Sequence, residues 1–311
     1  MTNRLSSFAT ISRICVLCLA LAAGQAAARD YFVDQKHPDA SDKNAGTLAA
    51  PFKTIQAALD KAQAGDTVRV RGGVYRESVK FKRGGSYQHG AIFDPGSLSD
   101  IQWLTLEAYQ DEHVVVDGAV TIPAQQWQRV QGCKNTYWAP FVTAPYDDRI
   151  VNIVFRDGTL IMPTLKNVRG ANSSMIAGTT SSIVAAMPDD GAGDEGWYFD
   201  VKQKKLFVNF RGRVPGKEVE CRAIKWLEGI DAQSVSFARI RKLEIRNFIS
   251  SGLVLCRGHE FRVEDNYVHH CGHGLWGGPT SAGVIRRNTF TDIMGVCLQL
   301  GGLAARSSTR T

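Results

Sequence analysis

The chain has 311 residues, 44% of them hydrophobic and 22% charged, which is enough for one large folded domain or two modest ones. Its formal net charge is +7, but lysines and arginines are scattered and form no basic run typical of a nucleic-acid-binding arm. We therefore expect no nucleic-acid partner. A modest positive field suits an acidic polysaccharide such as a uronate polymer, and it suits neutral partners equally well.

The segment 1–28 has the pattern of a secretory signal peptide. Arg4 and Arg13 precede a short apolar run at 14–23, and Ala26 to Ala28 supply small residues before Arg29. The run is too short to span a bilayer comfortably. We expect residues 1–28 to be removed during export from a bacterial cytoplasm, leaving a secreted or periplasmic protein with no membrane contact. A buried N-terminal helix is the competing interpretation.

Five cysteines follow the predicted signal peptide: Cys133, Cys221, Cys256, Cys271 and Cys297. An odd number so widely spaced does not form a disulfide framework, although one bridge stays open in an oxidising compartment. We expect them to be small apolar residues of the interior.

Residues 31–79 predict a strand, one amphipathic helix and then further strands. Thr54 is a candidate N-cap, and Gly65 with Asp66 is the expected stop. The helix would have one narrow apolar face, made by Ile55, Ala58, Leu59 and Ala62. A lone helix before a series of strands is what the open end of a β-solenoid core needs as a cover.

This segment resembles the start of secreted right-handed parallel β-helix proteins of the carbohydrate-active type. The matching positions are Asp42, Asn44, Gly46, Thr47, Pro51, Phe52, Thr54, Ile55, Ala58, Gly65, Asp66, Val68, Val70, Gly73, Tyr75 and Arg76. The resemblance covers about a sixth of the chain. It implies an all-β fold, a right-handed parallel β-helix with an N-terminal capping helix, and a polysaccharide lyase or glycoside hydrolase activity. It does not choose between the two reactions.

The rest of the chain divides into segments that differ in their sequence pattern. Residues 29–121 are expected to form the cap and the first coils, with a loop at 83–99. Residues 122–225 are rich in aromatics and contain two predicted hairpins, at 151–160 and 196–210. They resemble the small β-rich insertion of some β-helix glycosidases; a more elaborate solenoid edge is the alternative.

Residues 226–302 show a repeat of about 22 residues, as expected for one coil of three short strands. Asn247, Asn266 and Asn288 recur in one register, and Gly252-Leu253, Gly274-Leu275 and Gly295-Val296 recur in another. Repeated asparagines at a turn predict an internal hydrogen-bond ladder. Residues 303–311 have no strand pattern, and we expect a C-terminally truncated solenoid that ends in an irregular tail.

The richest candidate site is residues 265–276. We expect Asp265, His270 and His273 to be catalytic, because carboxylates and histidines supply general acids and bases. His269, Trp276 and Arg287 are the expected substrate-binding residues. Turn histidines with a structural role are the competing interpretation. A zinc site from His269, Cys271 and His273 has suitable ligands but no second cluster, so no metal site is expected.

Charged residues one coil apart give further candidates. Asp265 is separated from Arg287, and Glu264 from Arg286, by one repeat length, so each pair predicts an ion pair between adjacent coils. Arg239, Arg241 and Arg246 are expected either to line the same groove or to alternate outward. The loop at 39–44 is expected to be structural.

The function expected is that of a secreted protein acting on a polysaccharide or oligosaccharide, with glycoside hydrolysis favoured over lysis because of the aromatic insertion. No cofactor is expected for a hydrolase, whereas a lyase of this type would use Ca²⁺. A non-catalytic polysaccharide-binding solenoid or an inactive truncated relative is the alternative.

Overall fold

The computed structural model describes residues 27–87, 101–142, 154–161, 195–200, 202–279 and 283–301. The predicted signal peptide and the tail at 303–311 lie outside these ranges, apart from residues 27 and 28. The described residues are mostly β-strand with a single α-helix, so the expectation of an all-β fold is confirmed. No helix among them is long and apolar enough to cross a membrane.

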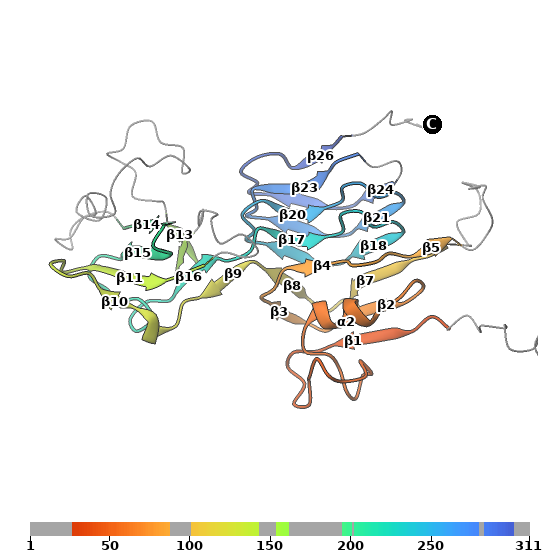
Figure 1. Cartoon of the computed structure of the whole chain (residues 1–311), viewed down its shortest axis with the longest axis horizontal. Helices are drawn as coiled ribbons and strands as arrows, with labels where there is room; N and C mark the ends of the chain where they lie inside the picture. Colours follow the sequence, from red (N-terminus) through yellow and green to blue (C-terminus); the bar gives the residue numbers. More distant parts are fainter. Residues whose placement is uncertain are drawn as a thin grey trace, which may run out of the picture.

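Three parallel sheets make up the larger part of the structure (Figure 1). Sheet A contains β1 (Asp30–Val33), β2 (Thr67–Val70), β7 (Leu104–Ala108), β18 (Ala238–Arg241), β21 (Phe261–Glu264) and β24 (Gly283–Arg286). Sheet B contains β3 (Gly73–Tyr75), β8 (Val114–Asp117), β19 (Glu244–Arg246), β22 (Tyr267–His269) and β25 (Thr289–Thr291). Sheet C contains β4 (Val79–Lys80), β17 (Glu228–Asp231), β20 (Ser251–Val254), β23 (His273–Gly277) and β26 (Leu298–Leu300).

From β2 onward the strands of these three sheets follow one another along the chain in the order A, B, C, and this order repeats. A strand therefore pairs with the strands one circuit before and after it. Val263 pairs with Ile285, and Leu253 pairs with Leu275. The circuits therefore stack strand upon strand, as Figure 1 shows for β17, β20 and β23. The repeat predicted from the sequence matches the length of one circuit.

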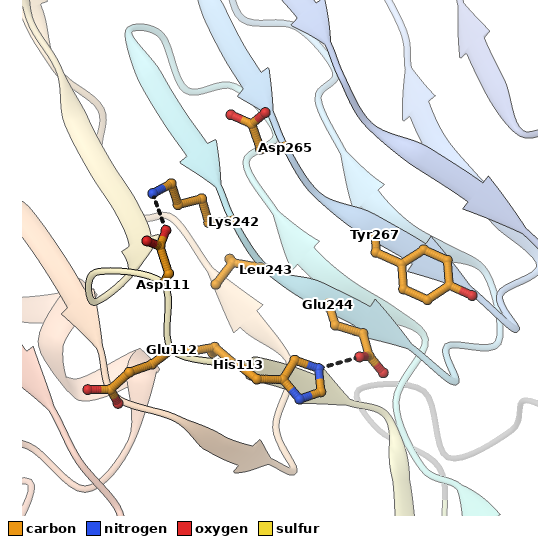
Figure 2. Close-up of a pocket in the computed structure, with 9 residues that line it drawn as sticks. Asp111, Glu112, His113, Lys242, Leu243, Glu244, Asp265 and Tyr267 are labelled. Carbon is orange, nitrogen blue, oxygen red and sulfur yellow. Dashed lines mark hydrogen bonds and ion pairs between the residues drawn. The ribbon is translucent and has the colours of Figure 1, made fainter.

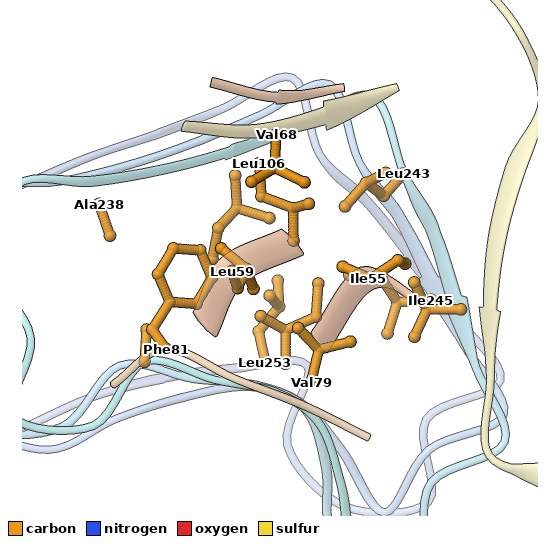
Figure 3. Close-up of a cluster of buried hydrophobic side chains, with 14 of the residues drawn as sticks. Ile55, Leu59, Val68, Val79, Phe81, Leu106, Ala238, Leu243, Ile245 and Leu253 are labelled. Atoms are coloured by element: carbon orange, nitrogen blue, oxygen red, sulfur yellow. The ribbon is translucent and has the colours of Figure 1, made fainter. Parts of the chain in front are cut away.

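Alternation along each strand creates the core between the sheets. In sheet A the inward positions are Val68, Leu106, Ile240 and Val263, which lie in one row across four strands and are all fully buried. Figure 3 shows members of this cluster from all three sheets meeting in the interior. The residues on either side of the inward row point outward, which leaves the outer faces free to carry polar side chains.

Helix α2 (Ile55–Lys61) packs its apolar face on this core. Ile55, Ala58, Leu59 and Ala62 are all buried, as predicted (Figure 3). The hydroxyl of Thr54 accepts a hydrogen bond from the backbone N–H of Ala57, which confirms it as the N-cap.

The predicted stop of this helix was wrong. The helix ends at Lys61 with Ala62 as its C-cap, and Gly65, whose φ is +91°, lies in the turn that follows. The carboxylate of Asp66 explains the early end, because it accepts from the backbone N–H of Gln63 and fixes the turn.

The loop at 39–44 is structural, as expected. The carboxylate of Asp42 accepts hydrogen bonds from the backbone N–H groups of Lys53 and Thr54 and so fixes the approach to α2. The side-chain amide of Asn44 donates to the carbonyls of Asp39 and Pro51.

Antiparallel sheets are inserted between β8 and β17 and lie to one side of the parallel sheets (Figure 1). One contains β10 (Gln128–Arg129), β11 (Thr136–Pro140), β15 (Lys205–Asn209) and β14 (Gly196–Asp200). The other contains β13 (Thr159–Ile161), β12 (Val154–Arg156), β16 (Cys221–Ile224) and β9 (Ala119–Thr121). A short 3₁₀ turn (Ala124–Gln126) follows β9, and β5 (Ser86–Tyr87) pairs with β6 (Ile101–Gln102) between β4 and β7.

Both predicted hairpins are confirmed in this inserted part, as β12 with β13 and β14 with β15. It has an apolar core of its own, to which Trp197, Phe199 and Phe210 contribute. The exact domain limits proposed from the sequence stay a prediction.

The asparagine repeat is correct for two of its three members. Asn266 donates from Nδ2 to Oδ1 of Asn288, 2.9 Å away, at the turn between sheets A and B. Asn247 lies instead at the turn after β19, where it donates to Asp117. The residue beneath Asn266 is Leu243, whose backbone N–H donates to Oδ1 of Asn266.

The Gly-Leu repeat is likewise correct for two of its three members. Gly252-Leu253 and Gly274-Leu275 stack, but Leu275 pairs with Leu298, so the assignment of Gly295-Val296 as the third member was wrong.

No disulfide joins Cys221, Cys256, Cys271 or Cys297 in the described part of the chain. Cys221 and Cys271 are buried and apolar in role, as predicted, whereas Cys297 is exposed, contrary to the expectation.

Candidate functional site

The outer face of sheet B carries a group of polar side chains that come from separate circuits. On β22, Val268 is fully buried, so Tyr267 and His269 on either side of it point outward. Glu244 on β19 pairs with Tyr267, and Arg246 pairs with His269. Four side chains from two circuits therefore share one face.

Glu244 is the centre of this group. Its Oε1 lies 2.8 Å from Nη1 of Arg246 and 3.1 Å from Nε2 of His269. Its Oε2 lies 2.6 Å from Nε2 of His113, just before β8. These partners, His269 foremost, lower the pKa of Glu244 to about 2 in spite of its burial, so the carboxylate is ionised at neutral pH.

A chain of ring contacts extends from Glu244. The ring of Tyr267 stacks on that of His269 with centroids 4.4 Å apart. Nδ1 of His269 lies 2.5 Å from Nδ1 of His270. When Nε2 of His269 donates to Glu244, Nδ1 of His269 is free to accept from His270, and the three residues form a continuous hydrogen-bonded path. Burial, and then the neighbouring His269, lower the pKa of His270, which favours its neutral form.

Asp117, from the circuit before β19, holds the group in place. It is fully buried on β8, and its carboxylate accepts from Asn247 at 2.7 Å, from the backbone N–H of Ala119 at 2.9 Å and from Arg246 at 3.1 Å. Since Arg246 also donates to Glu244, Asp117 fixes the guanidinium that holds the outer carboxylate.

An open pocket of about 490 Å³ lies beside Glu244 (Figure 2). It is lined by Asp111, Glu112, His113, Val114, Lys242, Leu243, Glu244, Asp265 and Tyr267. Nζ of Lys242 lies 2.9 Å from Asp111 at one rim, and the His113–Glu244 pair lies on the other side. The pocket thus offers one exposed aromatic ring and charges of both signs.

The predicted site residues divide between two sheets. Asp265 lines the pocket, and His269 and His270 reach it through Glu244. His273 and Trp276 lie on β23 in sheet C, with ring centroids 5.0 Å apart, and none of the described contacts joins them to the pocket. Nδ1 of His273 accepts from the backbone N–H of Val296 in the next circuit.

The predicted pairing of Asp265 with Arg287 is confirmed, with two hydrogen bonds of 2.6 and 2.8 Å. Glu264 likewise pairs with Arg286 at 2.6 Å. Both Asp265 and Arg287 have a positive φ at the turn between sheets A and B. Asp265 is thereby held ionised, because Arg287 lowers its pKa.

Of the two alternatives for Arg239, Arg241 and Arg246, a single shared groove is wrong, and the alternation holds for the first two, which flank buried Ile240. Arg239 and Arg241 lie on β18 in sheet A, whereas Arg246 lies on β19 in sheet B, beyond a corner of the chain. The zinc alternative also fails, because Cys271 is fully buried and points to the carbonyl of His269. Within the described ranges no group of three or more His, Cys, Asp or Glu side chains is placed to hold a metal ion.

Sequence reasoning missed His113, Glu244 and Tyr267. Glu244 and Tyr267 are register partners one circuit apart, so the repeat could have linked them. His113 is 131 residues from Glu244, and only the pairing of β8 with β19 across the insertion brings them together. Nothing local in the sequence indicates that pairing.

Over less than a third of its length the chain is similar to two curated proteins. The chain is 37% identical over 91 residues to pectate lyase PEL9 of Emericella nidulans, and 36% identical over 81 residues to the uncharacterized protein YwoF of Bacillus subtilis. These stretches are 29% and 26% of this chain but only 19% and 14% of the relatives, so the chain spans a small part of each. No protein-family model matches the chain.

Two solved structures share the fold over most of the chain. XylC in complex with xylose superposes on 81% of this chain and 42% of its own, with a TM-score of 0.52 and 20% identity. A glycoside hydrolase superposes on 86% of this chain and 74% of its own, also with a TM-score of 0.52, at 12% identity. At these identities the likeness is one of fold alone.

Proposed function

We propose that this protein is a right-handed parallel β-helix that binds and cleaves a polysaccharide or oligosaccharide, with glycoside hydrolysis favoured over lysis. In this proposal the three parallel sheets are the three faces of the helix, and α2 is its N-terminal cap. The repeated passage through sheets A, B and C supports the first point. The buried face of α2 on the common core supports the second.

The observation that carries the proposal is the extent of the shared fold. The inserted segment, residues 119–224, is about a third of the chain. Superpositions that cover 81% and 86% of the chain must therefore include part of it. The two structures are a complex with xylose and a glycoside hydrolase, whereas the pectate lyase similarity is confined to 29% of the chain. The insertion thus favours hydrolysis.

The pocket on sheet B supplies groups for this chemistry. The exposed ring of Tyr267 offers a face on which a sugar ring stacks. Glu244, ionised and held from three sides, is a weak base, and it fits the role of nucleophile or of stabiliser of positive charge that develops on the sugar. The path through His269 to His270 would move a proton away from or toward Glu244.

The other site residues predicted from the sequence have supporting roles in the proposed saccharide binding. Asp265, with Arg287 as its partner, would orient a sugar at the pocket rim. His273 and Trp276 would extend the binding surface onto sheet C, where the indole offers a second stacking face.

Binding without catalysis is the second candidate, and one observation favours it. Glycoside hydrolysis ordinarily needs a carboxylic acid with a raised pKa to protonate the leaving group. Among the described carboxyls that have a shifted pKa, only Glu77 is raised, by burial, and it accepts from the backbone N–H groups of Ile55 and Gln56 at the start of α2. Glu244 and Asp265 are both held ionised.

Export is part of the proposal. Removal of residues 1–28 would leave a secreted or periplasmic protein, in keeping with an extracellular polysaccharide. N-terminal sequencing of the product from a bacterial host is expected to start near Arg29, and a product that keeps Met1 in the cytoplasm would contradict export.

A substrate screen separates the reactions. We expect new reducing ends from neutral or acidic oligosaccharides without the ultraviolet absorbance of an unsaturated uronate. That absorbance would show a lyase instead. Saccharide binding without either product would support the binding role, and neither binding nor product from any saccharide would overturn the proposal.

A further inference from the structure

Trp103, which directly precedes β7 of sheet A, is flanked by two arginines. The guanidinium carbon of Arg239 lies 5.2 Å from the centroid of the indole, and that of Arg262 lies 4.9 Å from it. Both cations therefore lie within the range of cation–π attraction to the same ring. The ring itself is fixed edge-on against Phe237, with centroids 6.2 Å apart.

Arg239 and Arg262 are direct register partners on β18 and β21. Their neighbours Ile240 and Val263 are fully buried, so both arginines project from the outer face of the sheet. Two like charges directly opposite one another on adjacent strands repel and destabilise the pair. The carboxylates of Glu107 and Glu264 offset part of this repulsion at Arg239, and an anion bound between the two guanidinium groups would offset more of it.

The next row of the same sheet shows how the fold neutralises arginines elsewhere. Two residues further along the strands, Arg69 and Arg241 both pair with Glu107, and Arg286 pairs with Glu264. The charges alternate along this row from one circuit to the next. It needs no outside ligand.

Arg239 and Arg262 have no such partner. Neither guanidinium forms an ion pair or hydrogen bond with any residue in the described part of the chain. Nε of Arg239 is moreover buried and has no hydrogen-bond partner there. An N–H donor of a charged group left unpaired in this way is costly. Nε itself is covered by protein, but the side chains of both arginines are only half-buried, so a ligand can approach their guanidinium groups.

We propose that Trp103, Arg239 and Arg262 form a binding site for the carboxylate of an acidic saccharide, a uronate residue. Planar guanidinium groups bind a carboxylate through paired hydrogen bonds, and two of them side by side suit one anion with two oxygens. The choice of a saccharide as the carrier rests on the proposed function. The site itself is on sheet A and separate from the Glu244 pocket on sheet B.

Calorimetric titration of the full chain tests the site. The probes are trigalacturonate, the neutral xylotriose with the same number of rings, and sodium sulfate. We expect trigalacturonate to bind at least about tenfold more tightly than xylotriose, because each charge-assisted contact contributes that much. Sulfate that binds as well as trigalacturonate would show a simple anion site and overturn the assignment to a saccharide.

Matched variants locate the binding. Arg262→Gln and Arg239→Gln are each expected to weaken trigalacturonate about tenfold or more, and Arg262→Lys to weaken it less, since lysine keeps the charge but loses the planar fork. Arg286→Gln removes the same charge from the same face, at a position already paired with Glu264, and should leave the affinity within about twofold. The midpoint of thermal unfolding shows which variants fold. If Arg239→Gln does not fold, Arg262→Gln and Arg262→Lys still test the site.

An equal loss in Arg286→Gln, or none in the Arg262 variants, would overturn the proposal. The activity screen follows product formed at the Glu244 pocket, whereas the titration follows the affinity that is lost when Arg262 is replaced. A failed activity screen and a failed sheet A site are therefore seen in separate measurements.

Discussion

Oε1 of Glu244 lies 3.1 Å from Nε2 of His269, and this contact joins two successive circuits of the parallel sheets. The other carboxylate oxygen reaches His113 from the circuit before, on the far side of the inserted sheets. Three circuits thus meet at one carboxylate. Because each is placed by backbone pairing, the geometry of the group depends on the register of the sheet rather than on a loop.

Replacement of Glu244 by Gln tests its role in turnover. Gln keeps the shape but loses the charge, so we expect any glycoside cleavage to fall by about 100-fold or more. Initial rates on the substrate found in the screen give the measurement. Glu264→Gln, which removes a buried, paired carboxylate from sheet A, is the control and should keep most of the rate. A Glu244→Gln variant with full turnover would remove Glu244 from the chemistry.

Glu244 also predicts how the stability of the protein changes at acid pH. The pKa of Glu244 in the folded protein, about 2, lies below its ordinary value of 4.5. Its stabilising contribution is therefore complete above pH 4.5 and is lost as the pH falls toward 2. Urea unfolding of the wild type and Glu244→Gln should differ most above pH 4.5, and the difference should shrink on acidification below it. A difference that grows on acidification would contradict the assignment.

His270 gives a second prediction for the dependence of stability on pH, at a higher pH than that of Glu244. Its pKa is lowered from the ordinary 6.5, so the folded protein resists its protonation, and stability falls as the pH drops below 6.5. His270→Asn should flatten the unfolding midpoint between about pH 7 and pH 5 relative to the wild type. An unchanged slope would show that His270 is not the group responsible.

The asparagine ladder makes a prediction about stability. Asn266→Ala leaves the backbone N–H of Leu243 and the carbonyl of Ile240 without their buried partner. We expect a loss of about 2–3 kcal/mol in the free energy of unfolding. Asn288→Ala, in a more exposed circuit, should cost less. Equal and negligible losses for both would mean that the ladder does not stabilise the turn.

The N-cap of α2 gives a separate test of the first part of the fold. Thr54→Ala removes the hydroxyl that accepts from Ala57 and should cost about 1 kcal/mol. Thr54→Ser keeps the acceptor and should stay close to the wild type in the same urea titration. If both variants lose the same amount, packing of the methyl group rather than capping is responsible.

Local patterns in the sequence predicted much of the fold. The spacing of Ile55, Ala58 and Leu59 located the helix face, and the two hairpins appeared as strand pairs around short polar turns. The 22-residue spacing of Asp265 and Arg287 correctly predicted an ion pair between circuits. Each of these signals depends on residues within one element or one circuit.

The rest of the site required long-range information. His113 and Glu244 meet because β8 pairs with β19 across the whole insertion. Asn247 matched the repeat by type but lies at a different turn, because circuits of unequal length shift a strict count. His273 and Trp276 are close in sequence to His269, yet one corner of the chain turns them onto sheet C.

A crystal structure of the Glu244→Gln variant with a bound oligosaccharide tests directly whether the saccharide lies on the outer face of sheet B. We expect a sugar ring stacked on Tyr267, with a hydroxyl or ring oxygen within hydrogen-bond distance of residue 244. A saccharide on His273 and Trp276 of sheet C, with the sheet B pocket empty, would contradict it.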